Sequence, residues 1–271
     1  MSIEMLRSHW GFGRNPFTKD LAPSMLHGSL RHQEAVARLS WCVNEGAIGI
    51  VTGEVGAGKT VAVRAASAAL EPSRFSVIYI ANPTVGVRGL YSHIVSSLGV
   101  VPRFHRASLV PQARDCLSAE RAERGRSVVV VIDEAHMLDN DCLEELRMLT
   151  CSDMDSGSPL ALLLVGQPTL RRRIKLGQFA ALDQRIALRY VLEGMDRKET
   201  GDYIDHHLKL AGRADTLFST DAVDLIHQVS RGLPRSVNNL CIQSLIAAYA
   251  TKKAIVDEST ARAAIAEVMA D

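Results

Sequence analysis

The chain has 271 residues, of which 47% are hydrophobic, and its 31 basic and 30 acidic residues give a formal net charge of +1. This composition is typical of a globular protein with a full core and excludes a disordered chain. Because such a chain is not a general polycation, any nucleic-acid surface has to come from local clusters of arginine and lysine. The length suits one α/β domain followed by a small helical domain.

The cysteines are dispersed and show neither a CxxC pair nor zinc-finger spacing: Cys42, Cys116, Cys142, Cys151 and Cys241. Scattered thiols in odd number favour a reduced, cytoplasmic protein over a disulfide framework. The first ten residues lack the apolar core of a signal peptide. The longest apolar runs are far shorter than a membrane span. We therefore expect a soluble, cytoplasmic protein with no membrane segment.

Helical and strand-like patterns alternate up to Leu192. A helical pattern from Leu30 to Val43 precedes five apolar runs of strand length: Ile48–Thr52, Ser76–Ile80, Ser127–Ile132, Leu160–Val165 and Leu188–Leu192. Helical patterns separate or follow them at Lys59–Leu70, Gly89–Leu98, Val110–Arg124, Asp141–Thr150 and Pro168–Leu176. The middle strands are apolar without alternation, as in strands buried on both faces of a parallel sheet. The alternation predicts a three-layer α/β domain.

From about Met195 the pattern is helical only. Asp196 and Glu199 form a capping box that opens one helix. Ser219 or Thr220 caps a second, and two more are expected at Arg235–Ala250 and Asp257–Met269. We therefore divide the chain into an N-terminal segment (1–45) that completes a nucleotide site, an α/β domain (46–194) and a helical lid domain (195–271).

A phosphate-binding loop joins the first strand to the next helix. It matches G-x-x-x-x-G-K-[ST] in the strand–loop–helix context that the motif requires, through Gly53, Glu54, Val55, Gly56, Ala57, Gly58, Lys59 and Thr60. Backbone N–H groups of such a loop turn towards phosphates, which also face the positive end of the helix dipole. Lys59 is placed for the β- and γ-phosphates and Thr60 for Mg²⁺. The motif predicts ATP and Mg²⁺ as cofactors.

The run Val128–Glu134 supplies the second half of this site. An apolar strand ends in Asp133, expected near Mg²⁺, and in Glu134, expected to orient or deprotonate the attacking water. Asp133 to His136 also spell the DEAH of certain helicases, an interpretation that the length of the chain disfavours. We expect His136 to start a helix or support the site rather than to bind a metal.

Three further polar residues are candidates. Gln167 follows the fourth strand, where it either contacts the γ-phosphate or the attacking water, or is a turn residue. Arg185 precedes the last strand and Arg235 starts a helix of the lid. Each arginine alone is more often a surface or salt-bridge residue.

Together these motifs resemble the AAA+ ATPases, within the group that contains the ExeA-type ATPases and the transposition ATPases TniB and TnsC. The resemblance covers nearly the whole chain, and the GQP, QRIALR and GLPR segments in this order are more specific than the phosphate loop. It rests on Gly11–Phe17, His32–Leu39, Thr52–Thr60, Val131–His136, Leu164–Pro168, Asp183–Arg189, Gly232–Arg235 and Asn238–Leu240.

The resemblance implies a parallel five-stranded sheet in the order 5-1-4-3-2, a helical lid and an ATP site between subunits of an oligomer. It implies that Gln167 is sensor 1, although Asn, Thr or Ser is more usual there. Arg185 would be the arginine finger given to a neighbouring subunit, with Arg189 as the alternative, and Arg235 would be sensor 2. The adenine pocket would be lined by Asn15, Pro16 and Phe17.

Three functions stay open at this stage. The chain ends after the lid, whereas the secretion member of the group resembles a longer protein. We therefore expect a cytoplasmic ATPase that oligomerises on double-stranded DNA and selects targets for a transposase or its adaptor protein. The alternatives are an ExeA-like ATPase for secretion or envelope assembly, and a STAND-like nucleotide switch. We expect the DNA phosphates to meet loop arginines, namely Arg88, Arg103 and Arg106. The basic run Arg171–Arg173 with Lys175 is expected to be a solvated helix surface.

Overall fold

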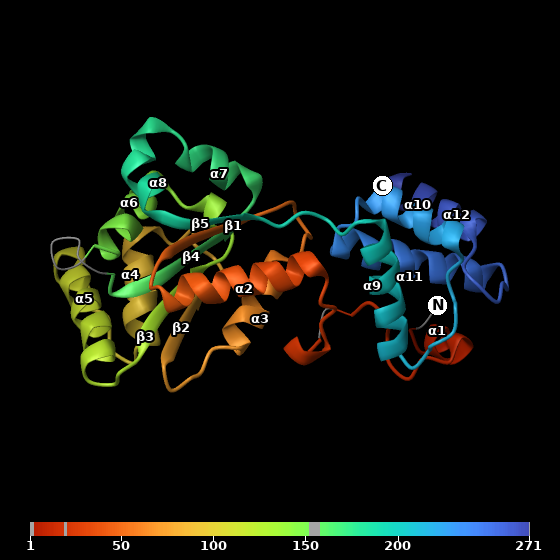
Figure 1. Ribbon diagram of the computed structural model, residues 1–271, viewed down its shortest axis with the longest axis horizontal. Coiled ribbons are helices and arrows are strands. Elements are labelled where there is room, and N and C mark those ends of the chain that lie inside the picture. Colours follow the sequence, from red (N-terminus) through yellow and green to blue (C-terminus); the bar gives the residue numbers. More distant parts are fainter. Residues whose placement is uncertain (1–2, 19–20, 152–157, 271) are drawn as a thin grey trace. The chain divides into compact units, whose positions relative to one another are not determined.

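The computed structural model describes residues 3–18, 21–151 and 158–270 (Figure 1). The chain forms two compact units. The α/β unit holds His32–Val55 and Lys59–Leu192, and the helical unit holds the chain up to Arg31, the short stretch Gly56–Gly58, and the chain from Glu193 onward. This division differs from the three segments expected from the sequence, because the residues before Arg31 pack with the C-terminal helices.

A five-stranded parallel sheet forms the centre of the α/β unit. Its strands follow the order β2-β3-β4-β1-β5, and every pair of neighbours is parallel. The order 5-1-4-3-2 is therefore confirmed. The strands are β1 (Ile48–Thr52), β2 (Phe75–Ile80), β3 (Ser127–Ile132), β4 (Leu160–Gly166) and β5 (Ile186–Val191).

Helices cover both faces of this sheet (Figure 1). Because successive side chains of a strand point to opposite faces, Ile50 and Leu164 belong to one core and Val51 and Leu163 to the other. The first core is completed by α4 (Gly86–Ser97), α5 (Arg106–Ala122), η2 (Ala135–Met137), α6 (Asn140–Leu149), α7 (Pro168–Ile174), η4 (Gly177–Phe179) and α8 (Ala180–Arg185). The second is completed by α2 (Leu30–Asn44) and α3 (Lys59–Ala68).

Gly49 allows α2 to approach β1 closely. A Cβ atom at Gly49 would lie 2.8 Å from Cys42 Sγ and 3.1 Å from Leu163 Cδ2. Real Cβ atoms essentially never come that near to the sulfur. Burial raises the pKa of the Cys42 thiol to about 12, so this contact involves a neutral, inert thiol.

The helical unit contains α1 (Ile3–Trp10), η1 (Pro23–Met25), α9 (Arg197–Leu210), α10 (Thr220–Ser230), α11 (Pro234–Ala250) and α12 (Glu258–Ala270). The expected capping box is confirmed: the Asp196 side chain accepts from Glu199 N at 2.8 Å, and the Glu199 side chain accepts from Asp196 N at 3.0 Å. Ser219 caps α10. Helix α1 was not predicted. In the described part of the chain, no helix is long and apolar enough to cross a membrane.

A buried cluster of rings lies in the core of the helical unit. The Phe17 ring stacks on His207 with centroids 5.3 Å apart, and Tyr203 and His206 also contact His207. Burial, together with the neighbouring imidazoles of His206 and His27, lowers the pKa of His207 to about 4. His207 is therefore neutral at pH 7.

Three elements start at least two residues before the position expected from the sequence. Helix α4 begins at Gly86 rather than Gly89, α5 begins at Arg106 rather than Val110, and β5 begins at Ile186 rather than Leu188. Proline is common at helix starts because it lacks an N–H, but α5 begins earlier and passes through Pro111. Arg88 and Arg106 were expected in loops, but Arg88 lies in α4 and Arg106 is the first residue of α5.

Candidate ATP and magnesium site

The phosphate loop has the predicted strand–loop–helix context. Strand β1 ends at Thr52 and α3 begins at Lys59. Between them Gly56 and Gly58 have φ values of 84° and 93°, a backbone region open to glycine and strained for other residues. At the start of the loop, Gly53 N donates to Gly166 O at 3.3 Å, which fixes the loop to the end of β4.

Lys59 is buried and reaches back across the loop. The residue is only 8% exposed, and its Nζ donates to Gly53 O at 2.8 Å and to Glu54 O at 2.9 Å. A buried ammonium is costly unless it is hydrogen-bonded. Phosphate oxygens are stronger partners than neutral carbonyls because both groups are charged, so this lysine is suited to an anionic ligand.

The Asp133 carboxylate is the most heavily hydrogen-bonded group of the site. Its Oδ2 accepts from Thr60 Oγ1 at 2.7 Å and from the Tyr79 hydroxyl at 2.8 Å, and its Oδ1 accepts from Glu134 N at 2.9 Å. Asp133 itself is buried. These contacts hold the carboxylate beside the first turn of α3, where the phosphate loop ends.

Glu134 differs from Asp133 in its backbone conformation and in its exposure. Its backbone is left-handed, with φ 50°, and its side chain is 48% exposed with Oε2 lying 3.3 Å from His136 Nδ1. A non-glycine residue in this region costs about 1–3 kcal/mol and is found most often at functional sites. Asp133 is buried and the Glu134 side chain is half-exposed, so the two adjacent acids are suited to different tasks.

The donor set fits magnesium bound together with a nucleotide. Mg²⁺ is usually held by one or two side chains, with phosphates and waters completing its shell. The Thr60 hydroxyl and Asp133 are such a pair, and within the described residues no group of three His, Cys, Asp or Glu side chains could hold a metal by itself. When bound, the ion would neutralise charge on the phosphates.

The two expected phosphate sensors lie at the starts of helices. Gln167 is half-buried at the N-cap of α7 and its side chain makes no cap hydrogen bond. Arg235 is exposed in the first turn of α11. Its backbone N donates to Gly56 O at 3.3 Å, within the helical unit. The roles of both residues as sensors stay predictions.

The two candidate finger arginines have different surroundings. Arg185 ends α8 and is half-buried. Arg189 lies in β5, where Nη1 donates to Ile186 O at 2.9 Å and Nη2 lies 3.0 Å from Asp183 Oδ1. These contacts give Arg189 a structural task, and the role of Arg185 as the finger stays a prediction.

The residues expected at the adenine lie in the helical unit. Phe17 is a core residue, 3% exposed, with a left-handed φ of 57°. Pro16 is buried and Asn15 is half-buried. The Phe17 ring is thus occupied by its stack on His207, and the adenine contact stays a prediction for this segment.

Two of the three arginines expected at DNA are engaged within the chain. Arg88 Nε donates to Phe104 O at 2.9 Å, and its guanidinium lies over the Phe104 ring at 4.7 Å. Arg106 forms an ion pair with Glu145. Arg103 is exposed between the two helices. All three side chains are exposed, and their contact with DNA stays a prediction.

Sequence reasoning missed Tyr79. It lies in β2, the neighbour of β3, in register with Val131, so its side chain comes close to Asp133 at the carboxyl edge of the sheet. Burial and the hydrogen bond to Asp133 raise the pKa of the Tyr79 phenol above its ordinary value. The signal that could have identified Tyr79 is its place near the end of β2, since the neighbouring strand β3 ends in an acidic residue.

Comparison with known families agrees with this geometry. Residues 43–174 match the family model described as an AAA domain. The matched span has the fold of an AAA domain. The matched span holds β1 to α7, with the phosphate loop, Asp133 and Glu134, and so contains the side chains expected to bind nucleotide and metal.

One curated relative extends the match beyond this domain. The chain is 34% identical over 250 residues to the general secretion pathway protein A of Aeromonas hydrophila. The alignment covers 91% of this chain and 45% of that protein. The chain thus spans less than half the length of this relative.

Solved structures share the fold. Cdc6p from Pyrobaculum aerophilum has a TM-score of 0.65 at 18% identity, over 89% of this chain and 67% of that one. The Aeropyrum pernix ORC1 protein in complex with DNA has 0.66 at 15%, over 93% and 68%. The Thermotoga maritima RuvB branch migration motor has 0.56 at 18%, over 88% and 68%. At these identities the likeness shows the AAA+ fold alone.

Proposed function

We propose that this chain hydrolyses ATP with Mg²⁺ and that this activity drives a step of secretion or envelope assembly. The observation that carries the first part is the separation of the two acids at the end of β3. Asp133 is buried and bonded to Thr60, as a metal-side ligand requires, while Glu134 is half-exposed on a strained turn, as a base facing water requires.

Each residue of the site would have its own task. Lys59 and the N–H groups of the phosphate loop bind the phosphates. Thr60 and Asp133 hold the metal on the phosphate oxygens. Glu134 orients the attacking water and takes its proton. A second copy of the chain would supply Arg185.

The secretion role is supported by the relative at 34% identity, which is a general secretion pathway protein. This relationship favours the secretion alternative over the transposition partner expected from the sequence.

The biochemical test is phosphate release by the purified protein with ATP, in the presence and absence of Mg²⁺ and of duplex DNA. Metal-dependent release that is lost in Lys59→Ala and indifferent to DNA supports the proposal. Release that requires DNA would instead support the transposition interpretation. Absence of release from correctly folded protein would favour the nucleotide switch.

The cellular test places Lys59→Ala in the chromosomal copy of the host gene and compares the proteins exported by the cells. Reduced export with unchanged cytoplasmic amounts of the same proteins supports the secretion role. Normal export, with the variant produced at the wild-type level, would overturn it while leaving the ATPase assignment intact.

A further inference from the structure

His136 lies two positions after Glu134, and the site described above gives it no task. The residue belongs to the 3₁₀ helix η2, and its side chain is 17% exposed. The ring atom Nδ1 is buried and has no hydrogen-bond partner among the described residues. Buried polar atoms without a partner are rare in folded proteins, so this nitrogen needs a partner that can reach it.

The Glu134 carboxylate is within reach of this nitrogen. Its Oε2 lies 3.3 Å from His136 Nδ1, a distance at which a small rotation of the half-exposed glutamate would complete a hydrogen bond. The Glu134 side chain has no other hydrogen bond or ion pair with a described residue. A carboxylate only accepts hydrogen bonds, so His136 has to carry a proton on Nδ1 to form this one.

The turn that carries His136 is held by contacts on several sides. Ala135 and Leu138 are buried in the core between the sheet and the helices. Arg173, which was expected on a solvated surface of α7, is half-buried, and its Nη1 donates to His136 O at 3.2 Å. At the end of β4, a Cβ atom on Gly166 would lie only 3.1 Å from His136 N. The backbone of His136 is therefore fixed beside the Glu134 carboxylate.

A half-exposed glutamate is by itself a poorly oriented base. Its side chain has several rotamers in water, and a base is effective only when its oxygen is within hydrogen-bond reach of the proton that it takes. A base is therefore commonly oriented by a third group. A hydrogen bond from His136 to Oε2 would restrict the Glu134 side chain and leave Oε1 for the water.

We propose that His136 is a positioning residue for Glu134: its Nδ1–H holds Oε2 of the carboxylate so that Oε1 faces the attacking water. This inference rests on the proposed function, in which Glu134 takes the proton of that water. His136 itself contacts neither the nucleotide nor the metal. Its loss should lower the rate of hydrolysis and leave ATP and Mg²⁺ binding intact, since Lys59, Thr60 and Asp133 are not its partners.

The test compares two substitutions of similar shape. Asparagine places an amide N–H near the position of the histidine Nδ1, and leucine has a similar outline without a donor. His136→Leu should lower kcat by about 10–100-fold with an unchanged KM for ATP, because a hydrogen bond to a charged group is lost. His136→Asn should recover most of that loss. Phosphate release is measured over a range of ATP concentrations at saturating Mg²⁺.

A double variant separates positioning from general damage to the turn. In the Glu134→Gln background, His136→Leu should change the residual rate by less than about twofold, because no base is left to position. A damaged turn would lower the rate by the same factor in both backgrounds, and that result would overturn the proposal. Met137→Leu, at an exposed residue of η2, is the control and should hydrolyse ATP as the wild type does.

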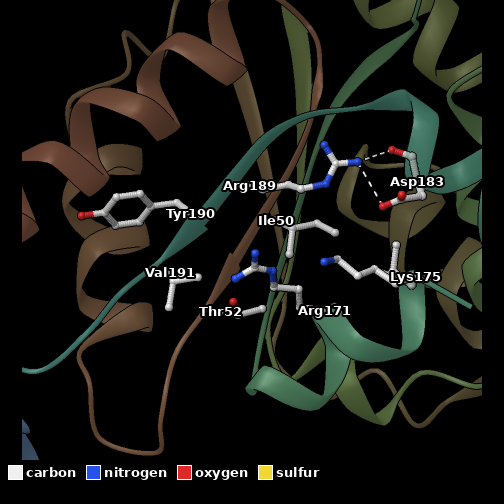
Figure 2. Close-up of a pocket in the computed structure, with 9 residues that line it drawn as sticks. Ile50, Thr52, Arg171, Lys175, Asp183, Arg189, Tyr190 and Val191 are labelled. Atoms are coloured by element: carbon white, nitrogen blue, oxygen red, sulfur yellow. Dashed lines mark hydrogen bonds and ion pairs between the residues drawn. The ribbon is translucent and has the colours of Figure 1, made fainter.

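The support from α7 is tested in the same assay. Arg173→Gln removes the bond to His136 O and should lower kcat by a smaller factor than His136→Leu. Arg171→Gln is the matched control, because residues two positions apart do not share one side of a helix. Arg171 is exposed and lines a hollow with Thr52 of β1 (Figure 2). A loss in Arg171→Gln as large as that in Arg173→Gln would count against the support from Arg173.

The failure of this proposal can be told from a failure of the ATPase function. A wild type that releases no phosphate, or Glu134→Gln at the wild-type rate, would overturn both. A rate that depends on Glu134 but is unchanged in His136→Leu, or is equally reduced in the leucine and asparagine variants, would overturn the role of His136 alone. Thermal unfolding is measured for each variant, and His136→Ala replaces a leucine variant that does not fold.

Discussion

The Thr60 hydroxyl donates a hydrogen bond of 2.7 Å to Asp133 Oδ2 and so joins the helix after the phosphate loop to the end of β3. The two residues are 73 positions apart in the chain. This bond brings together the two side chains that the motifs assign to magnesium. A substitution at either residue should therefore change how the reaction depends on the Mg²⁺ concentration.

Asp133→Asn should raise the Mg²⁺ concentration needed for half-maximal ATP hydrolysis by about tenfold or more, since replacing a charged metal ligand is worth at least about 1.4 kcal/mol. The amide still accepts from Thr60, so the fold should hold. Hydrolysis is measured across a Mg²⁺ titration. Asp141→Asn, in the exposed first turn of α6, is the control, and an equal shift in both variants would argue against Asp133 as a ligand.

Glu134→Gln should bind ATP as the wild type does while hydrolysis falls by about 10²–10⁴-fold, the usual worth of a general base. The change removes the proton acceptor and leaves the phosphate loop and Asp133 in place. Nucleotide binding and phosphate release are measured on the same protein. Glu123→Gln, at the exposed end of α5, should be unaffected. Wild-type hydrolysis by Glu134→Gln would remove Glu134 from the mechanism.

Arg185→Ala should lose about 10³–10⁵ in rate if it is an arginine finger. Because the finger acts on the neighbouring copy, mixing Arg185→Ala with Lys59→Ala should restore activity at mixed interfaces, since each supplies what the other lacks. The rate of the mixture is compared with the sum of the separate rates, under conditions where assembly is verified. An unchanged sum would contradict a site built by two copies. Arg189→Ala should instead lower thermal stability, since Arg189 holds Asp183 and Ile186.

The stability of the protein should fall as the pH decreases from about 6.5 to about 4, the interval between the ordinary and the lowered pKa of His207. In this interval the His207 imidazole is protonated in the unfolded chain but stays neutral in the folded protein. The lost stability is on the order of 3 kcal/mol, and His27, whose pKa is also lowered by burial, adds to it in the same direction. Urea unfolding at a series of pH values measures the effect. His207→Gln should flatten the dependence and the exposed His93→Gln should not; equal slopes would contradict the assignment.

Gly49→Ala should destabilise the protein by about 1–3 kcal/mol through overpacking, because the new methyl group meets Cys42 Sγ. Combining it with Cys42→Ala should recover part of the loss, since the smaller side chain vacates the space. Gly177→Ala, where nothing lies within 4 Å of an added Cβ, controls for the general effect of replacing glycine. A double variant less stable than Gly49→Ala alone would show that the strain has another origin.

The sequence predicts those parts of the structure that depend on local pattern. Apolar strand runs and the phosphate loop follow from neighbouring residues, and the strand order from the resemblance. The contacts of Tyr79 with Asp133 and of Arg106 with Glu145 do not follow, because each joins residues tens of positions apart. The burial of Phe17 is of the same kind: its pairing with His207 exists only once the residues before Arg31 pack with α9.

The left-handed backbone at Glu134 bears on how this protein would respond to laboratory evolution. Glycine adopts that conformation without strain, so a library selected only for thermal stability should enrich the substitution Glu134→Gly. A library selected for ATP turnover should retain the acid. If the two selections favour different residues at position 134, the stability difference between those variants is the stability that the glutamate costs.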